Sequence, residues 1–200
     1  TGMAAHSSLA PLAVNAVHLA CDLVSAIRSR QQSIIETGTH DEAYNIPYTT
    51  LHVGRIEGGV QVNIVPQEAS LEFEIRNLAG DDPAILIEAI TQDIAPVIAA
   101  AQKTSPEADI RLTVVNSYPG LETALDERVV ALLRDLTGVN ATCKVAFGTE
   151  GGLFARDLGI PTVVCGPGSM DQGHKPDEFV TVEQLAICDQ MLGGLTARLQ

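Results

Sequence analysis

The sequence predicts an α+β ferredoxin-like domain over residues 1–118, followed over residues 119–200 by the C-terminal portion of an α/β domain. In the first part, long segments with apolar residues at helical spacing alternate with segments of period-two alternation. Beyond residue 118, short β-branched runs alternate with helical segments, the order that is typical of a parallel sheet. Two convincing strands cannot make a covered sheet, so we expect the second part to complete a larger domain.

The first domain opens with residues 3–8, which are small and strand-like but begin without a turn. Pro11 suits a first helical turn, and apolar residues follow at helical spacing to Arg30. Period-two alternation then predicts strands over Tyr48–Arg55 and Leu71–Arg76. These residues predict a strand, a long amphipathic helix and two further strands.

A second helix is predicted from Asp81–Pro83, where acidic residues and a proline suit a helix start, to about Lys103. Ile110–Val114 is the expected last strand. The order strand, helix, strand, strand, helix, strand gives two split βαβ units, a four-stranded antiparallel sheet with both helices on one face. The first and third strands are central in such a sheet, which leaves Tyr48–Arg55 at an edge.

The second part is expected to begin with a helix and to alternate two strands with helices until a final helix. Thr181 and Gln184 stand in capping-box relation at the start of that last helix. The expected elements are a helix over residues 123–137, a strand over 143–147, a helix over 153–158 and a strand over 160–165.

Composition excludes several classes of function. Hydrophobic residues make up 46% of the chain and charged residues 18%, as in a soluble globular protein. The net charge of −13 disfavours nucleic acid as a partner. We find no apolar run approaching the ~20 residues that cross a bilayer and no signal-like start, so we expect no membrane partner and a cytoplasmic protein. The four cysteines form no CxxC pair, and we expect reduced core residues.

One stretch concentrates polar residues after predicted strands. A glycine-rich turn over residues 148–152 follows the first strand of the second part, and the loop over residues 173–178 follows the second. Ligands bind beyond the carboxyl ends of strands in α/β sheets. His174 in this loop could be a metal ligand, a general base or a loop residue without a role in chemistry.

The run GTEGGLFARDLGIPTVVCGPGSMDQGHKPDE resembles the C-terminal signature of the acetylornithine deacetylase, desuccinylase and zinc carboxypeptidase family. The resemblance implies a lid (dimerisation) domain followed by the C-terminal portion of an α/β zinc-hydrolase catalytic domain. It also implies two zinc ions per subunit, for which cobalt can substitute, with His174 as a ligand of one. No HxxEH, HxD or Glu-Glu pair occurs here, so we expect the other ligands and the general base outside this chain, which alone should be inactive.

A second element, Gly2–Ser8, resembles the GxxAHS element of the same family. The resemblance gives His6 a catalytic role, in which it reaches the active site of the partner subunit and stabilises the developing oxyanion. An imidazole suits that task because it donates a hydrogen bond to charge on a carbonyl oxygen. A surface histidine without function is the alternative.

The resemblance also implies four substrate-binding residues, namely Asn63, Arg76, Thr149 and Glu150. A guanidinium grips a carboxylate with two hydrogen bonds, and Glu150 could face a substrate ammonium. The alternatives are an ion pair between Arg76 and neighbouring glutamates, and a helix-start carboxylate at Glu150. The implied partners are a small N-acyl amino acid and a second copy of the chain, paired through the edge strand Tyr48–Arg55 and the first helix.

The implied reaction is removal of the acetyl group from N-acetyl-L-ornithine, a step of arginine biosynthesis. Family members with that activity typically carry the GTE form seen at Gly148–Glu150, whereas desuccinylases carry GGTSD. A related desuccinylase, aminoacylase or carboxypeptidase is the close alternative. A dimerisation module without catalysis is the alternative from another class.

Overall fold

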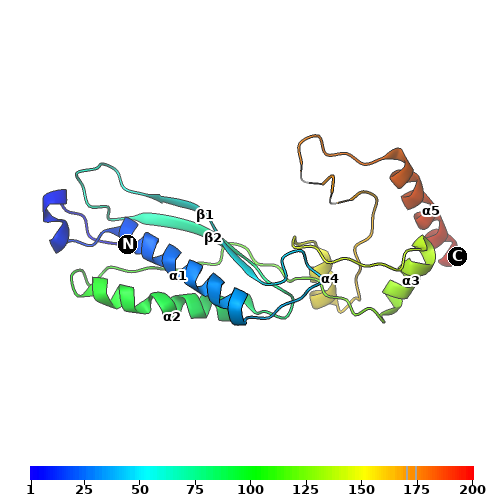
Figure 1. Ribbon diagram of the computed structural model, residues 1–200, viewed down its shortest axis with the longest axis horizontal. Helices are drawn as coiled ribbons and strands as arrows, with labels where there is room; N and C mark the ends of the chain where they lie inside the picture. The colour runs from blue at the N-terminus through cyan, green and yellow to red at the C-terminus, as the bar shows by residue number, and fades with distance from the viewer. Residues whose placement is uncertain (170, 174) are drawn as a thin grey trace. The chain divides into compact units, whose positions relative to one another are not determined.

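The computed structural model describes residues 1–169, 171–173 and 175–200, which divide into two compact units (Figure 1). Unit 1 consists of Thr1–Ser117 with Lys144–Phe147, and unit 2 of Tyr118–Cys143 with Gly148–Gln200.

Unit 1 contains a short 3-10 helix η1 (Ser7–Leu12), two long helices α1 (Ala16–Thr37) and α2 (Pro83–Gln102), and two strands. The side chain of Asn15 caps α1 by accepting hydrogen bonds from two backbone N–H groups. The side chain of Asp82 caps α2 by accepting a hydrogen bond from the Ala84 N–H, with Pro83 in the first turn as predicted. Local capping therefore defines where both long helices begin.

The core of unit 1 lies between these helices and one face of the strands. Ile27 of α1 and Ile90 and Ile94 of α2 are at most 1% exposed, and they form a cluster with Leu23. The apolar residues packed against this cluster from β1 and β2 are Leu51, Val53, Leu71 and Phe73. Both helices thus cover the same face of the sheet, as expected for the α+β lid.

The sheet of unit 1 pairs β1 (Thr50–Gly58) with β2 (Ala69–Arg76) in antiparallel register. Leu51 lies opposite Ile75 on the core face, and His52 lies opposite Glu74 on the wet face. An irregularity between Val53 and Arg55 interrupts the register at Gly54.

Two of the four expected strands are not strands in the part of the chain that the structure describes. Residues 3–8 form isolated bridges, Met3 with Val14 and His6 with Ile64, and then turn into η1. Residues 110–114 carry no strand assignment, although Ile110 and Leu112 pack on the core. Residues 3–8 pair with Val14 and with residues 63–65 only through isolated bridges, and no backbone hydrogen bond of residues 110–114 is found among the described residues, so neither segment forms a continuous ladder.

In the described residues of unit 2 there are three helices, α3 (Arg128–Thr137), α4 (Gly151–Leu158) and α5 (Val182–Arg198). The capping box of Thr181 and Gln184 at the start of α5 is confirmed. The expected strands over residues 143–147 and 160–165 are wrong for the described residues, which carry no strand there. Ile160 and Val164 remain 51% and 62% exposed, so no second layer covers this apolar segment.

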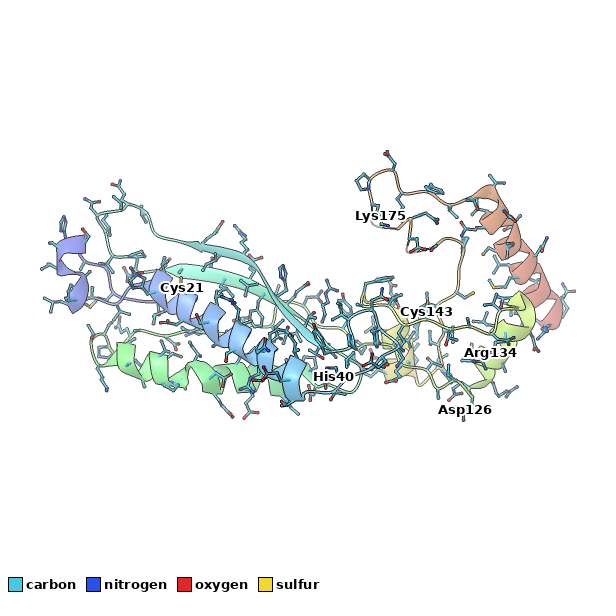
Figure 2. The ribbon with its side chains drawn as sticks, in the orientation of Figure 1. Cys21, His40, Asp126, Arg134, Cys143 and Lys175 are labelled. Carbon is cyan, nitrogen blue, oxygen red and sulfur yellow. The ribbon has the colours of Figure 1, made fainter. Side chains whose placement is uncertain are left out.

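Two expectations from composition need correction. We expected no apolar run long enough to cross a bilayer, but α2 is the one described helix that is long and apolar enough by length and composition alone. Two of its isoleucines, Ile90 and Ile94, are buried in the core of unit 1. The cysteines are free, but they are not core residues, because Cys21, Cys143 and Cys165 are exposed and Cys188 is half-buried. Figure 2 labels Cys21 and Cys143.

Candidate functional site

His6 stands at the junction between the first extended segment and η1. It is the N-cap residue of η1, and its backbone bridges to Ile64. Two backbone hydrogen bonds flank that bridge, from Ser7 N–H to the Asn63 carbonyl at 2.9 Å and from Val65 N–H to the Ala5 carbonyl at 2.8 Å. The imidazole itself is exposed. The backbone of His6 is therefore fixed while its side chain faces solvent.

Ser8 determines which ring nitrogen of His6 can donate. The backbone N–H of Ser8 donates to Nδ1 at 3.3 Å, and Ser8 Oγ lies 2.8 Å from the same nitrogen. A nitrogen that accepts from a backbone N–H carries no proton, so the neutral ring holds its proton on Nε2. The ring thus presents an N–H donor to solvent. Sequence reasoning missed Ser8, although a hydroxyl two residues after the histidine is a recognisable signal.

Asn63 is the one predicted substrate-binding residue that unit 1 brings next to His6. The backbone carbonyl of Asn63 accepts the hydrogen bond from the Ser7 N–H, and the residue is exposed. An imidazole and a side-chain amide on adjacent segments can both donate hydrogen bonds to the polar group of one small molecule.

Arg76 lies elsewhere in unit 1. It ends β2, whereas the bridge from His6 to Ile64 precedes the start of that strand at Ala69. The eight residues of β2 at ~3.3 Å each span roughly 23 Å, so Arg76 and His6 are not neighbours within the unit. Arg76 Nη2 forms an ion pair with Glu74 Oε2 at 2.9 Å along the same strand.

Thr149 and Glu150 belong to unit 2, at the turn that starts α4. Thr149 Oγ1 accepts from Gly151 N–H at 3.2 Å, which occupies one amide that could otherwise bind an anion. Glu150 is the N-cap position of α4 without a side-chain capping bond, and it is exposed. A Cβ on Gly151 would stand 2.9 Å from Leu121 Cδ2, and one on Gly152 would collide with the Pro119 carbonyl. The glycine pair therefore permits close packing of the turn.

His174, the predicted zinc ligand, lies outside the described residues. Among the residues that the structure does describe, no three histidine, cysteine, aspartate or glutamate side chains gather in a group that could hold a metal ion. The described residues alone therefore do not fit a zinc site, and no catalytic step through a metal can be derived from them.

The outer edge of β1 is partly covered by Gln31 of α1, which sequence reasoning also missed. Gln31 Nε2 donates to the Thr49 carbonyl at 3.2 Å, and its Oε1 accepts from Leu51 N–H at 2.5 Å. The side-chain amide thus acts as a peptide group of a neighbouring strand would. We expected unpaired backbone groups over the whole of Tyr48–Arg55. That expectation is wrong at the N-terminal end of the segment, where Gln31 pairs with Thr49 and Leu51, and the open edge begins at Val53.

Comparison with known proteins covers both units. The family described as the peptidase dimerisation domain matches residues 1–101, about half of the chain. An acetylornithine deacetylase from Yersinia pseudotuberculosis serotype O:1b is 30% identical over 198 residues, which cover 98% of this chain and 48% of the relative. One from Salmonella heidelberg is 35% identical over 182 residues, covering 90% and 45%. The chain thus spans about half the length of the curated relatives it matches.

Two solved structures with the same fold are peptidases. A tripeptidase from Staphylococcus aureus superposes with a TM-score of 0.67 at 24% identity, covering 96% of this chain and 47% of that one. An M20 family metallo-carboxypeptidase from Sulfolobus solfataricus superposes with a TM-score of 0.56 at 20% identity, covering 96% and 58%. The chain belongs to the peptidase dimerisation domain family, and it is similar to acetylornithine deacetylases along nearly its whole length.

Proposed function

We propose that this chain is the lid domain and the closing part of the catalytic domain of a zinc-dependent amidohydrolase that removes the acetyl group from N-acetyl-L-ornithine. One observation carries the proposal. Similarity to acetylornithine deacetylases extends over 198 residues and so includes both the His6 element and the GTE turn.

His6 would stabilise the transition state of amide hydrolysis. When a nucleophile adds to the acetyl carbon, negative charge develops on the carbonyl oxygen. The exposed Nε2–H of His6 is a donor aimed away from its own backbone, because Ser8 occupies Nδ1. Removing one such donor from an oxyanion site typically lowers kcat by ~10²–10³.

Two residues would recognise the two charged groups of acetylornithine, its α-carboxylate and its side-chain ammonium. Arg76 suits the α-carboxylate, and the exposed carboxylate of Glu150 suits the side-chain ammonium. In this role the substrate carboxylate would compete with Glu74, whose Oε2 lies 2.9 Å from Arg76 Nη2.

In the longer protein, zinc would be held by His174 together with ligands outside this chain. When bound, the zinc would supply a Lewis acid. Because the described residues form no ligand group, we expect this chain alone to bind zinc weakly and to be inactive. The relatives are about twice as long as this chain, which is the basis for expecting the missing ligands there.

A homodimer would form through β1 and α1. The outer edge of β1 from Val53 onward has no strand partner among the described residues, and an open edge pairs readily with a second copy. Membership in the dimerisation domain family supports this assembly.

The test of the proposed function is turnover by the full-length protein of acetylornithine, succinyl-diaminopimelate and acetylmethionine, each assayed with zinc. The proposal predicts preference for acetylornithine and no turnover by residues 1–200 alone. Preference for the succinyl substrate would favour the desuccinylase alternative, and no hydrolysis of any of them would favour a module without catalysis.

A further inference from the structure

The guanidinium of Arg76 already holds a carboxylate of its own strand. Arg76 Nη2 lies 2.9 Å from Glu74 Oε2, and the two side chains are 43% and 49% exposed. Residues two apart on a strand point to the same side of the sheet, so both side chains lie on the wet face of β2. The group to which the proposed function assigns the substrate carboxylate thus carries an internal carboxylate.

The end of the ladder leaves Arg76 open to a ligand. Arg76 pairs with Thr50 in the last rung of β1 and β2, and no further pair of these strands lies beyond it. A guanidinium carries five N–H donors and binds a carboxylate best through two of them in parallel. A ligand carboxylate that binds there meets the like charge of Glu74, and this repulsion disfavours both carboxylates at one guanidinium.

Glu74 has a second partner within reach. His52 of β1 lies directly opposite Glu74, and both residues are exposed. Cβ atoms of directly opposed residues are ~4.5–5.5 Å apart, so an imidazole N–H can donate to the carboxylate across the two strands. A Cβ on Gly54 would stand 3.9 Å from His52 Nε2, so the glycine leaves the imidazole space to turn.

The exchange favours ligands that carry a carboxylate. An ion pair as exposed as that of Arg76 and Glu74 contributes little free energy, so a ligand carboxylate can replace Glu74. A neutral amide or ester offers the guanidinium no charge in return, and it leaves the internal ion pair in place. Glu74 therefore selects against ligands without a carboxylate.

We propose that Glu74 is an internal competitor at the carboxylate subsite of Arg76. It occupies the guanidinium in the free protein and moves toward His52 when a ligand carboxylate binds. Glu74 thereby determines the affinity of the subsite and its selectivity for acyl amino acids with a free α-carboxylate. This inference rests on the proposed role of Arg76 in substrate binding, and it adds the residue that tunes that role.

The competition can be measured in this chain without catalysis. Glu74→Gln keeps the shape of the side chain and removes its charge. The matched control is Glu72→Gln on the same strand and face, because Glu72 Oε1 pairs with Arg55 Nη1 at 3.0 Å. The probe is sodium acetate, with sodium chloride at equal ionic strength as the salt control. The readout is the Nε–H NMR signal of Arg76, assigned by its loss in Arg76→Lys.

The acetate concentration at half-maximal shift should fall roughly 2- to 5-fold in Glu74→Gln, the ratio that corresponds to loss of an exposed ion pair. It should stay unchanged in Glu72→Gln. Equal midpoints in Glu74→Gln and the unaltered chain would overturn the proposal, and so would an Arg76 signal that does not respond to acetate in any variant.

Kinetics of the full-length protein separate this inference from the proposed function. Acetylornithine, succinyl-diaminopimelate and acetylmethionine each carry an α-carboxylate, so Glu74→Gln should lower KM by a similar factor for whichever of them is hydrolysed, with kcat unchanged. A lowered kcat at constant KM would overturn the proposal. A lower acetate midpoint without hydrolysis of any of the three would refute the proposed deacetylase and still support competition by Glu74.

Discussion

Lys144 Nζ lies 2.7 Å from Asp41 Oδ2 and joins two residues 103 positions apart within unit 1. The same ammonium stands 5.4 Å from the centroid of the Tyr44 ring. Asp41 also organises its own loop, because Asp41 Oδ1 accepts from Ala43 N–H at 2.9 Å. His40, labelled in Figure 2, packs edge-to-face on Tyr48 at the end of that loop. The loop between α1 and β1 is thus centred on Asp41.

This contact predicts an acid-dependent change in the loop. The hydrogen bond from Lys144 is the main cause that lowers the pKa of Asp41 below its ordinary value, with a smaller contribution from Ala43 N–H. A lowered folded-state pKa gives stability that is present above the unfolded value of about 3.9 and is lost as pH falls through the folded value. Lys144→Met should therefore raise the pKa of Asp41 in a carboxyl NMR titration. Arg156→Met is the control, and an unchanged Asp41 titration in Lys144→Met would refute the contact.

The core of unit 1 predicts a large difference between two isoleucines of α2. Ile90 is 0% exposed and Ile85 is 65% exposed. Ile90→Ala should lower the free energy of unfolding by about 2–5 kcal/mol, because it removes buried methyl groups and leaves a cavity. Ile85→Ala on the same helix should change it by less than about 1 kcal/mol. Urea denaturation of both variants measures this, and equal losses would show that the two helices do not pack as described.

The edge of β1 predicts where proline disrupts a dimer. Leu51 N–H points outward to Gln31, so Val53 N–H, two residues on, points outward as well. Val53→Pro should therefore remove a donor for a second copy while sparing the ladder to β2, and sedimentation should detect more monomer. His52→Pro is the control, because His52 N–H faces β2 and its loss should lower the Tm.

Gln31 predicts the opposite effect on the same assembly. Its side chain competes with a partner strand for the Thr49 carbonyl and Leu51 N–H. Gln31→Ala should leave these groups open and strengthen association. A dimer that is unaffected by both Val53→Pro and Gln31→Ala would exclude this edge from the interface.

Glu150 predicts substrate preference in the full-length enzyme. If its carboxylate binds the ammonium of acetylornithine, Glu150→Gln should raise KM for that substrate by roughly 10-fold and leave acetylmethionine unchanged. Glu178→Gln, in the separate loop over residues 173–178, is the comparison variant. An equal loss for both substrates would give Glu150 a structural role at the start of α4.

Local signals in the sequence predicted the helices better than the strands. Pro83 and the pair Thr181 and Gln184 set helix starts without help from distant residues. The alternation in β1 and β2 was sufficient because the two strands are close in sequence and pair with each other. The segments 110–114 and 160–165 were not formed as strands, because a strand depends on neighbours that the local pattern does not contain.

In the candidate site, too, the sequence predicted single residues but not the contacts between distant segments. His6 and Asn63 were recognised separately, but their adjacency depends on a bridge between residues 58 positions apart in the chain. The proton position on His6 depends on Ser8, and the coverage of the β1 edge depends on Gln31. These are three-dimensional contacts that periodicity does not report. The roles of the site residues in catalysis stay predictions.

The central claim is that the lid of one subunit supplies His6 to the active site of the other. It can be tested by mixing two inactive full-length variants, His6→Ala and His174→Ala, under conditions that exchange subunits. If His6 acts across the dimer, each hybrid contains one site with both histidines intact.

The measurement is acetylornithine turnover before and after subunit exchange. The account predicts recovery to roughly a quarter of wild-type activity, because random exchange gives about half hybrids with one intact site in two. Activity that stays at the level of the separate variants, with hybrid formation verified by mass spectrometry, would contradict the claim and confine His6 to its own subunit.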